Sequence, residues 1–269
     1  MSVLEGVLLG CLEGITEFLP ISSSGHISLI QNFLSLNETQ TTALLGVLHI
    51  ATAVAAVMYF RSDIWTVVQA LLRKMGRLPV NDKDFILLKA LLLGSVPAIT
   101  VGFFIQPYAS GSSQATGFVA IVLFLSAVFF MYAEWRYYNR PVHESVTGKK
   151  GFLVGLFQVL SLLPGFSRAG AVMSGGMLLG MSRYEAARFS FLLAIPVTTV
   201  AGIRKLLELI GATGSINWVP IVAGGIATFF VALLTIHVFL GYTKRYTLWP
   251  FIWYNVILAC LVGYVSFIS

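Results

Sequence analysis

Apolar residues form long blocks along most of the chain, and six of these blocks have the length of a membrane-spanning helix. About 20 apolar residues in helical form cross the hydrocarbon core of a bilayer. The blocks follow one another closely, so we expect a single all-α membrane domain over residues 1–269 with short loops. The six predicted spans are residues 43–60, 86–106, 116–135, 189–204, 218–241 and 248–267.

Two further apolar blocks, 3–34 and 151–180, are interrupted halfway. The first contains proline, serine and glycine between Pro20 and Gly25, and the second does so between Pro164 and Gly170. Proline removes a backbone hydrogen bond from a helix. Irregular backbone at membrane depth is tolerated only where protein or a watery cavity surrounds it. We therefore predict two re-entrant helix-loop-helix hairpins beside the six transmembrane helices.

The two hairpins resemble each other when the first is shifted by 145 positions, although the prolines miss by one. Three spans follow each hairpin, which predicts an inverted repeat with halves at about 1–140 and 149–269, as in many transporter folds. Chance matching of common residue types is the alternative. The matched pairs are Gly6 with Gly151, Gly10 with Gly155, Glu13 with Gln158, Ser22 with Ser167 and Gly25 with Gly170.

Charge is scarce and is concentrated outside the apolar blocks. Only 10% of the residues are charged, against about 25% in soluble domains. The net charge of +6 comes without a basic block interleaved with aromatics, so no nucleic-acid partner is expected. Basic residues gather in 61–84, 136–150, 183–188 and 244–245, whereas 107–115 has no charge. The positive-inside rule makes the basic side cytoplasmic. Both termini and the mouth of the first hairpin then face outward.

Two carboxylates, Glu13 and Glu17, stand four positions apart within the first hairpin, on one helix face. Such a pair repels itself unless a cation, a proton or an arginine lies close. Hard divalent cations such as Mg²⁺ or Ca²⁺ prefer oxygen ligands, so both residues are candidate metal ligands. An acidic face in contact with water, or carboxylates that cap other helices, is the alternative.

The first break reads Ser22-Ser23-Ser24-Gly25-His26. Hydroxyls and free backbone N–H groups at a helix start favour an anion, so these residues are candidate substrate-binding groups. His26 is a candidate general base or nucleophile towards phosphorus, and Ser23 is the other candidate nucleophile; the sequence leaves open which of the two attacks. The alternative is an ordinary turn followed by a capped helix.

The second break reads Pro164-Gly165-Phe166-Ser167-Arg168. The planar guanidinium of Arg168 matches phosphate oxygens, and Gly165 and Ser167 are candidate partners in binding. A structural ion pair of Arg168 with one of the two glutamates is the alternative. It is compatible with phosphate binding.

The remaining candidates carry less chemistry. His49 and His237 stand singly within spans and are interpreted as packing or hydrogen-bonded residues. The aromatic residues at 249–254 are interpreted as an interfacial belt.

The motif from Glu13 to His26, with the motif at 164–168 and Ser174-Gly-Gly-Met beyond it, resembles the undecaprenyl-pyrophosphate phosphatase family of bacteria. The resemblance extends over the whole chain. It implies a hydrolase of the bacterial cytoplasmic (inner) membrane that removes the terminal phosphate of undecaprenyl pyrophosphate. This reaction recycles the lipid carrier for peptidoglycan and other cell-wall glycans.

The resemblance further implies an outward-facing (periplasmic or extracellular) site, a divalent cation and bacitracin resistance. A homodimer is a possible oligomeric state. Within the family motifs, the carboxylates match Glu13 and Glu17, the serine and histidine match Ser23 and His26, and the arginine motif matches Ser167 and Arg168.

The second motif departs from the family pattern, in which a serine follows the arginine and a threonine stands four residues after it. Here those positions are Ala169 and Val172. Each lost hydrogen bond to an anion costs roughly 1.5–3 kcal/mol of binding. Two alternatives follow from this departure and from the repeat: a polyprenyl-phosphate transporter, or a lipid-binding paralogue without turnover.

Overall fold

The computed structural model describes residues 1–26, 38–105, 116–139, 146–210 and 215–268. All regular structure within these ranges is helical, and six helices are long and apolar enough to cross a membrane. The six predicted spans are confirmed, and most of their helices extend a few residues further. They are α3 (Glu38–Tyr59), α5 (Asp82–Ile105), α6 (Thr116–Asn139), α9 (Arg183–Leu207), α10 (Trp218–Thr243) and α11 (Trp249–Ile268).

The first interrupted block begins with α1 (Val3–Thr16), whose start is stabilised by a capping box between Ser2 and Glu5. With 14 residues, α1 is about 21 Å long, short of the roughly 30 Å of a hydrocarbon core. A turn over residues 17–22 and a helical turn at 23–26 follow. The rest of the predicted hairpin, 27–34, lies outside the described residues.

The second interrupted block is also divided at the predicted place. It consists of α7 (Gly148–Gln158), the 3-10 helix η3 (Val159–Leu162) and, after a break, α8 (Arg168–Leu178). Ser167 caps α8 by accepting a hydrogen bond from the backbone N–H of Gly170.

Glycines bring α1 against α10 and α7 against α5 at backbone contact. A Cβ atom on Gly10 would lie 2.1 Å from the carbonyl oxygen of Gly224, and one on Gly155 would lie 2.3 Å from that of Gly94. Small residues at helix interfaces allow such approach in membranes, where dispersion contacts hold helices together. The end of α1 is thereby fixed in depth within the bundle.

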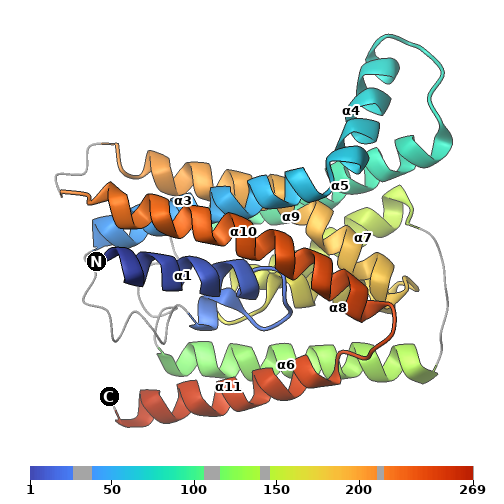
Figure 1. The fold of residues 1–269 in the computed structure, drawn as a ribbon. Helices are drawn as coiled ribbons and strands as arrows, with labels where there is room; N and C mark the ends of the chain where they lie inside the picture. Colours follow the sequence, from blue (N-terminus) through green and yellow to red (C-terminus); the bar gives the residue numbers. More distant parts are fainter. Residues whose placement is uncertain (27–37, 106–115, 140–145, 211–214, 269) are drawn as a thin grey trace.

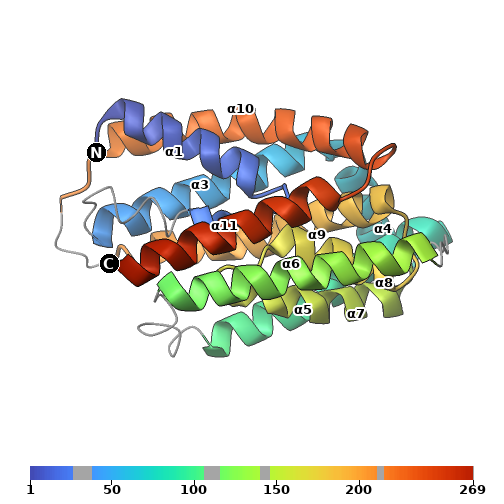
Figure 2. The same ribbon diagram turned by 90° about the horizontal axis from the view of Figure 1, so that it is seen from below.

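The two ends of the bundle differ. Both termini lie at one end, whereas α4, the start of α7 and the α10–α11 connection lie at the other (Figures 1 and 2). The segments predicted to share the basic side therefore share one end, as far as they are described. Arg140 and the uncharged 107–115 segment lie outside the described residues.

The expectation of short loops between the spans is wrong for residues 61–84, whose first part forms the helix α4 (Arg61–Met75). This helix projects from the bundle (Figure 1) and is amphipathic, with Trp65 and Met75 exposed among basic residues. Charged residues keep its mean hydropathy low, so a search for long apolar runs passes over it.

The largest buried cluster joins the first break to α8, α9 and α10. Phe18 packs edge-on against Phe191 with ring centroids 5.2 Å apart, and Val172 and Phe239 belong to the same cluster. Fully buried aromatic pairs of this kind hold their backbone segments firmly. The turn after Glu17 is therefore held against α9, beside the start of α8.

Candidate functional site

Glu13 and Glu17 lie at the inner end of α1 and are 1% and 7% exposed. Both carboxylate oxygens of Glu13 are buried and accept no hydrogen bond within the described part of the chain. His49 of α3 places its Nε2 3.6 Å from Oε1 of Glu13. Ligand atoms of all three side chains lie within 4.8 Å of one another. A buried carboxylate without hydrogen bonds is costly, so this cluster suits a cation.

Glu17 joins the two interrupted segments. Its Oε1 accepts a hydrogen bond from Arg168 at 3.1 Å, and its Oε2 accepts one from the Ser23 hydroxyl at 2.9 Å. The ion pair that was the alternative interpretation of Arg168 is therefore present. It orients the guanidinium beside Ser23 from a position 151 residues away in the chain.

Arg168 is further fixed by backbone carbonyls. It donates to the carbonyl oxygens of Glu17 at 3.2 Å and Ser190 at 3.4 Å. Its Nε is buried and has no partner among the described residues. The guanidinium is thus held in place, and a buried N–H without a hydrogen-bond partner is a candidate donor to an anion.

The serines of the first break adopt a strained and internally bonded turn. Ser22 has a φ of +62°, and its hydroxyl accepts from the backbone N–H of Gly25 at 3.2 Å. Ser24 accepts from the backbone N–H of Gly165 at 3.0 Å. A non-glycine residue in this backbone region costs about 1–3 kcal/mol, and such residues cluster at functional sites.

The second break repeats the capping of the first. Ser167 accepts from the N–H of Gly170 at 3.2 Å, as Ser22 does from Gly25. Gly165 has a φ of +99°, and a Cβ there would lie 2.7 Å from the carbonyl oxygen of Val119. Only glycine fits this turn, which brings its N–H to Ser24.

His26 is held in one orientation by its two ring nitrogens. Nδ1 lies 2.8 Å from the carbonyl oxygen of Ser22, so Nδ1 carries the hydrogen and donates it. In the neutral ring, Nε2 accepts from the hydroxyl of Tyr254 at 2.6 Å. A backbone carbonyl that fixes the tautomer is typical of a positioned base.

Three residues of the site were missed from the sequence: His49, Tyr254 and Asn255. Tyr254, which the sequence assigns to an interfacial belt, also contacts His26. Asn255 donates to the carbonyl oxygen of Pro20 at 2.6 Å and ties α11 to the first break. The available signal was the rule that polar side chains inside spans have partners. It does not say which partners.

The structure brings the candidate residues of both breaks together. Glu13, Glu17, Ser23 and Arg168 form its polar centre, and Ser22, Ser24 and Gly165 link the two turns. Ala169 and Val172, the two positions that differ from the family pattern, are closely packed and only 1% and 0% exposed. The hydroxyl that contacts Glu17 at the centre is that of Ser23. Carboxylates, a cation and hydroxyls at membrane depth suit a phosphorylated amphiphile.

Comparison with known proteins agrees with this kind of substrate. A family model described as "Bacitracin resistance protein BacA" matches residues 6–261. A protein of Marinobacter nauticus, named undecaprenyl-diphosphatase, is 32% identical over 97% of this chain and 98% of its own. Proteins of that name from Kineococcus radiotolerans and Colwellia psychrerythraea are 34% and 35% identical. The match to the Kineococcus protein covers 97% of this chain and 93% of that protein. The match to the Colwellia protein covers 100% of each chain.

Proposed function

The chain belongs to the bacitracin resistance protein BacA family, and on that premise we propose that it is an undecaprenyl-diphosphatase. It hydrolyses undecaprenyl pyrophosphate to undecaprenyl phosphate and inorganic phosphate, which recycles the lipid carrier of cell-wall glycans. The observation that carries the proposal is the contact of Glu17 with both Arg168 and Ser23. It joins a cation, a carboxylate and a hydroxyl at one point.

Ser23 is the nucleophile that the hydrogen bonds favour. Its hydroxyl donates to Glu17, which is placed to accept the proton as Oγ attacks the terminal phosphorus. The bond from phosphorus to the bridging oxygen then breaks, and undecaprenyl phosphate leaves. Water hydrolyses the phosphoseryl group to release phosphate. His26 is bonded to Ser22 and Tyr254, an arrangement that suits a base for this second step.

Arg168 stabilises the charge that develops on the transferred phosphoryl group. Its free Nε–H is the donor for a phosphoryl oxygen. The guanidinium is preorganised by Glu17 and two backbone carbonyls, so little reorganisation is needed in the transition state. Ser22, Ser24, Gly25, Gly165 and Ser167 shape the turns around the phosphate.

Glu13 and Glu17, with His49, are the residues that would hold a divalent cation, Mg²⁺ or Ca²⁺. The buried carboxylate of Glu13, without hydrogen bonds among the described residues, fits that ion. When bound, the ion offsets negative charge on the pyrophosphate. Glu17 can serve several partners because an ionised carboxylate has about four acceptor sites.

The two interrupted segments are re-entrant hairpins of an inverted repeat. The packing of α1 on α10 and of α7 on α5 supports this, because the repeat exchanges the first pair with the second. The matching caps at Ser22 and Ser167 support it too. The basic end is cytoplasmic in this arrangement, and the first hairpin opens to the periplasmic or extracellular side.

The activity is tested by phosphate release from undecaprenyl pyrophosphate in detergent micelles. We expect wild-type release with Mg²⁺ or Ca²⁺ and a loss of about 100-fold or more in Ser23→Ala, because the attacking oxygen is removed. Ser161→Ala is the matched control, since that hydroxyl donates to the carbonyl oxygen of Gln158 at the end of its own segment's first helix. Release by Ser23→Ala at the wild-type rate would transfer the role of nucleophile to another group. No release by folded wild-type protein would contradict the activity.

The metal site has a readout of its own. We expect Mg²⁺ or Ca²⁺ to raise the melting temperature of the wild-type protein and to have little effect on Glu13→Gln, because binding to the folded state stabilises it. Glu185→Gln, on a carboxylate bonded to Ser182, is the control. An equal shift in Glu13→Gln and wild type would exclude Glu13 as a ligand.

A further inference from the structure

A polar cavity lies at the basic end of the bundle, where α3, α9 and α10 meet the start of α4. Its volume is about 250 Å³, below the roughly 300–1,000 Å³ of sites for drug-sized ligands. It therefore suits a single headgroup-sized anion rather than a whole lipid. Its lining residues are Tyr59, Phe60, Asp63, Tyr184, Arg188, His237, Leu240, Gly241 and Lys244.

The cavity carries an excess of positive charge. Arg188 is paired with Asp63, and the Nζ of Lys244 lies 4.8 Å from the centroid of the Tyr184 ring. Among the described lining residues, Asp63 is the one acidic group against these two cations. Asp63 offsets the half-buried arginine, and the exposed ammonium of Lys244 adds one positive charge that has no acidic partner among the described lining residues.

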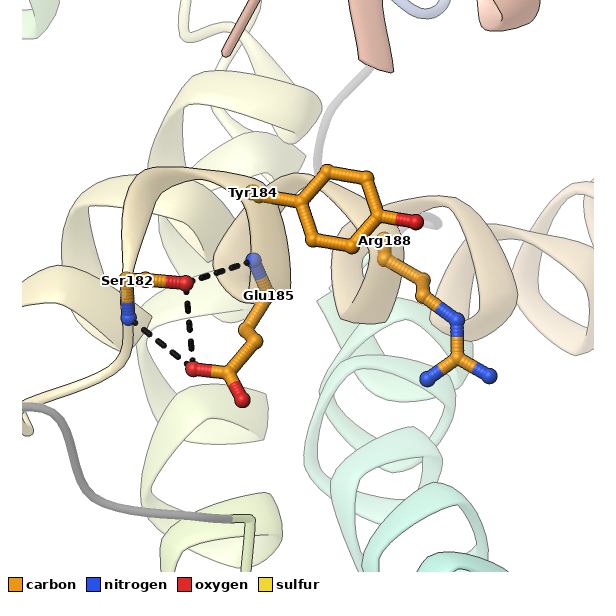
Figure 3. A pocket seen from close by; sticks show the side chains of 4 residues that line it. All are labelled: Ser182, Tyr184, Glu185 and Arg188. Carbon is orange, nitrogen blue, oxygen red and sulfur yellow. Dashed lines mark hydrogen bonds between the residues drawn. The ribbon is translucent and has the colours of Figure 1, made fainter. Parts of the chain in front are cut away.

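The acidic residue of the adjoining cavity, Glu185, is already hydrogen-bonded at the start of its own helix. A cavity of about 690 Å³ adjoins this one through the shared residues Tyr184 and Arg188, and it includes Glu185. The Glu185 carboxylate accepts from the backbone N–H and the hydroxyl of Ser182, and it stays at the helix start (Figure 3). Tyr184 and Arg188 extend away from that pair in the same view.

The walls offer hydrogen bonds as well as charge. The hydroxyl of Tyr59 lies 3.3 Å from Nδ1 of His237, and both side chains border the cavity. Phe60 and Leu240, 4% and 5% exposed, form its apolar floor. A mixture of guanidinium, ammonium and hydroxyl donors over an apolar floor matches a tetrahedral oxyanion, which has several acceptors.

This cavity is separate from the site at the two breaks. Tyr59 lies ten positions beyond His49 in α3, which is about 15 Å along a helix. None of the residues of the two breaks lines it. We propose that it is a second phosphate-binding site, with Lys244 and Arg188 as its charged ligands, for a lipid phosphate headgroup or for free phosphate.

The test counts bound phosphate on full-length protein in phosphatidylcholine nanodiscs. One arm titrates inorganic phosphate by calorimetry, and the other incorporates dioleoyl phosphatidate and measures its retention by native mass spectrometry. One of these two arms is expected to detect phosphate bound at this cavity. In that arm, we expect Lys244→Gln to weaken binding about tenfold or more, because a charged hydrogen bond is lost. Lys244→Arg retains binding. Lys83→Gln, an exposed lysine at the same end, is the control for charge.

Each outcome of this test either supports the proposed phosphate site or overturns it. A Lys244-dependent loss with inorganic phosphate assigns the site to the free anion, and a loss with phosphatidate alone assigns it to a lipid headgroup. Identical binding by Lys244→Gln and Lys83→Gln in both arms would overturn the proposal. Loss of phosphatase activity in Ser23→Ala leaves this test unaffected, because the readout is binding at the other cavity.

Discussion

Replacing Arg168 with alanine is expected to lower kcat/KM for undecaprenyl pyrophosphate by about 100-fold or more and to lower stability as well. The guanidinium is a preorganised donor, and loss of one such donor costs roughly 10²–10³ in rate. It also leaves Glu17, which is 7% exposed, as a buried carboxylate without its cation. Breaking a buried ion pair in this way costs about 3–5 kcal/mol.

Two further variants separate these effects. The double variant, Arg168→Ala with Glu17→Gln, removes both charges. We therefore expect it to recover much of the melting temperature lost in Arg168→Ala, while its activity stays low. Arg183→Ala breaks another buried pair, with Glu134 at 1% exposure, and should destabilise the protein without lowering the activity of the folded fraction to the same degree. Equal specific activity in Arg168→Ala and Arg183→Ala would exclude a role for Arg168 beyond folding.

The second large effect is expected at Gly10, where α1 touches α10. A Cβ in Gly10→Ala would lie 2.1 Å from the carbonyl oxygen of Gly224, and neither backbone can move without displacing its helix. Overpacking costs about 1–3 kcal/mol, occasionally more, so we expect the melting temperature to fall by roughly 5–10 °C. Activity should fall too, because the same helix carries Glu13 three positions later.

The control is another glycine in a packed helix. A Cβ on Gly241, in α10, would meet nothing within 4 Å, so Gly241→Ala should leave stability equal or raise it by up to about 1 kcal/mol. Thermal unfolding in detergent measures both variants. A melting temperature for Gly10→Ala equal to that for Gly241→Ala would show that α1 and α10 can separate at no cost.

The membrane class, the six spans and the places of both breaks could be predicted from the order of residues alone. These features depend on local physics. A run of about 20 apolar residues is stable in a bilayer only as a helix, and proline and glycine interrupt a helix wherever they stand. The sequence also supplied the kinds of chemistry at Glu13, Glu17, Ser23 and Arg168, although it left the ion pair of Arg168 open.

The contacts between side chains of the site depend on how the helices pack in three dimensions. Glu17 and Arg168 are 151 positions apart, and His26 and Tyr254 are 228 apart, so no local pattern predicts their hydrogen bonds. His49 joins the glutamates because α3 packs beside the end of α1. The amphipathic helix α4 is not found by a search for long apolar runs, because its charged residues interrupt the apolar face. Helix packing acts between segments that are distant in the chain, whereas sequence patterns record the few residues around each position.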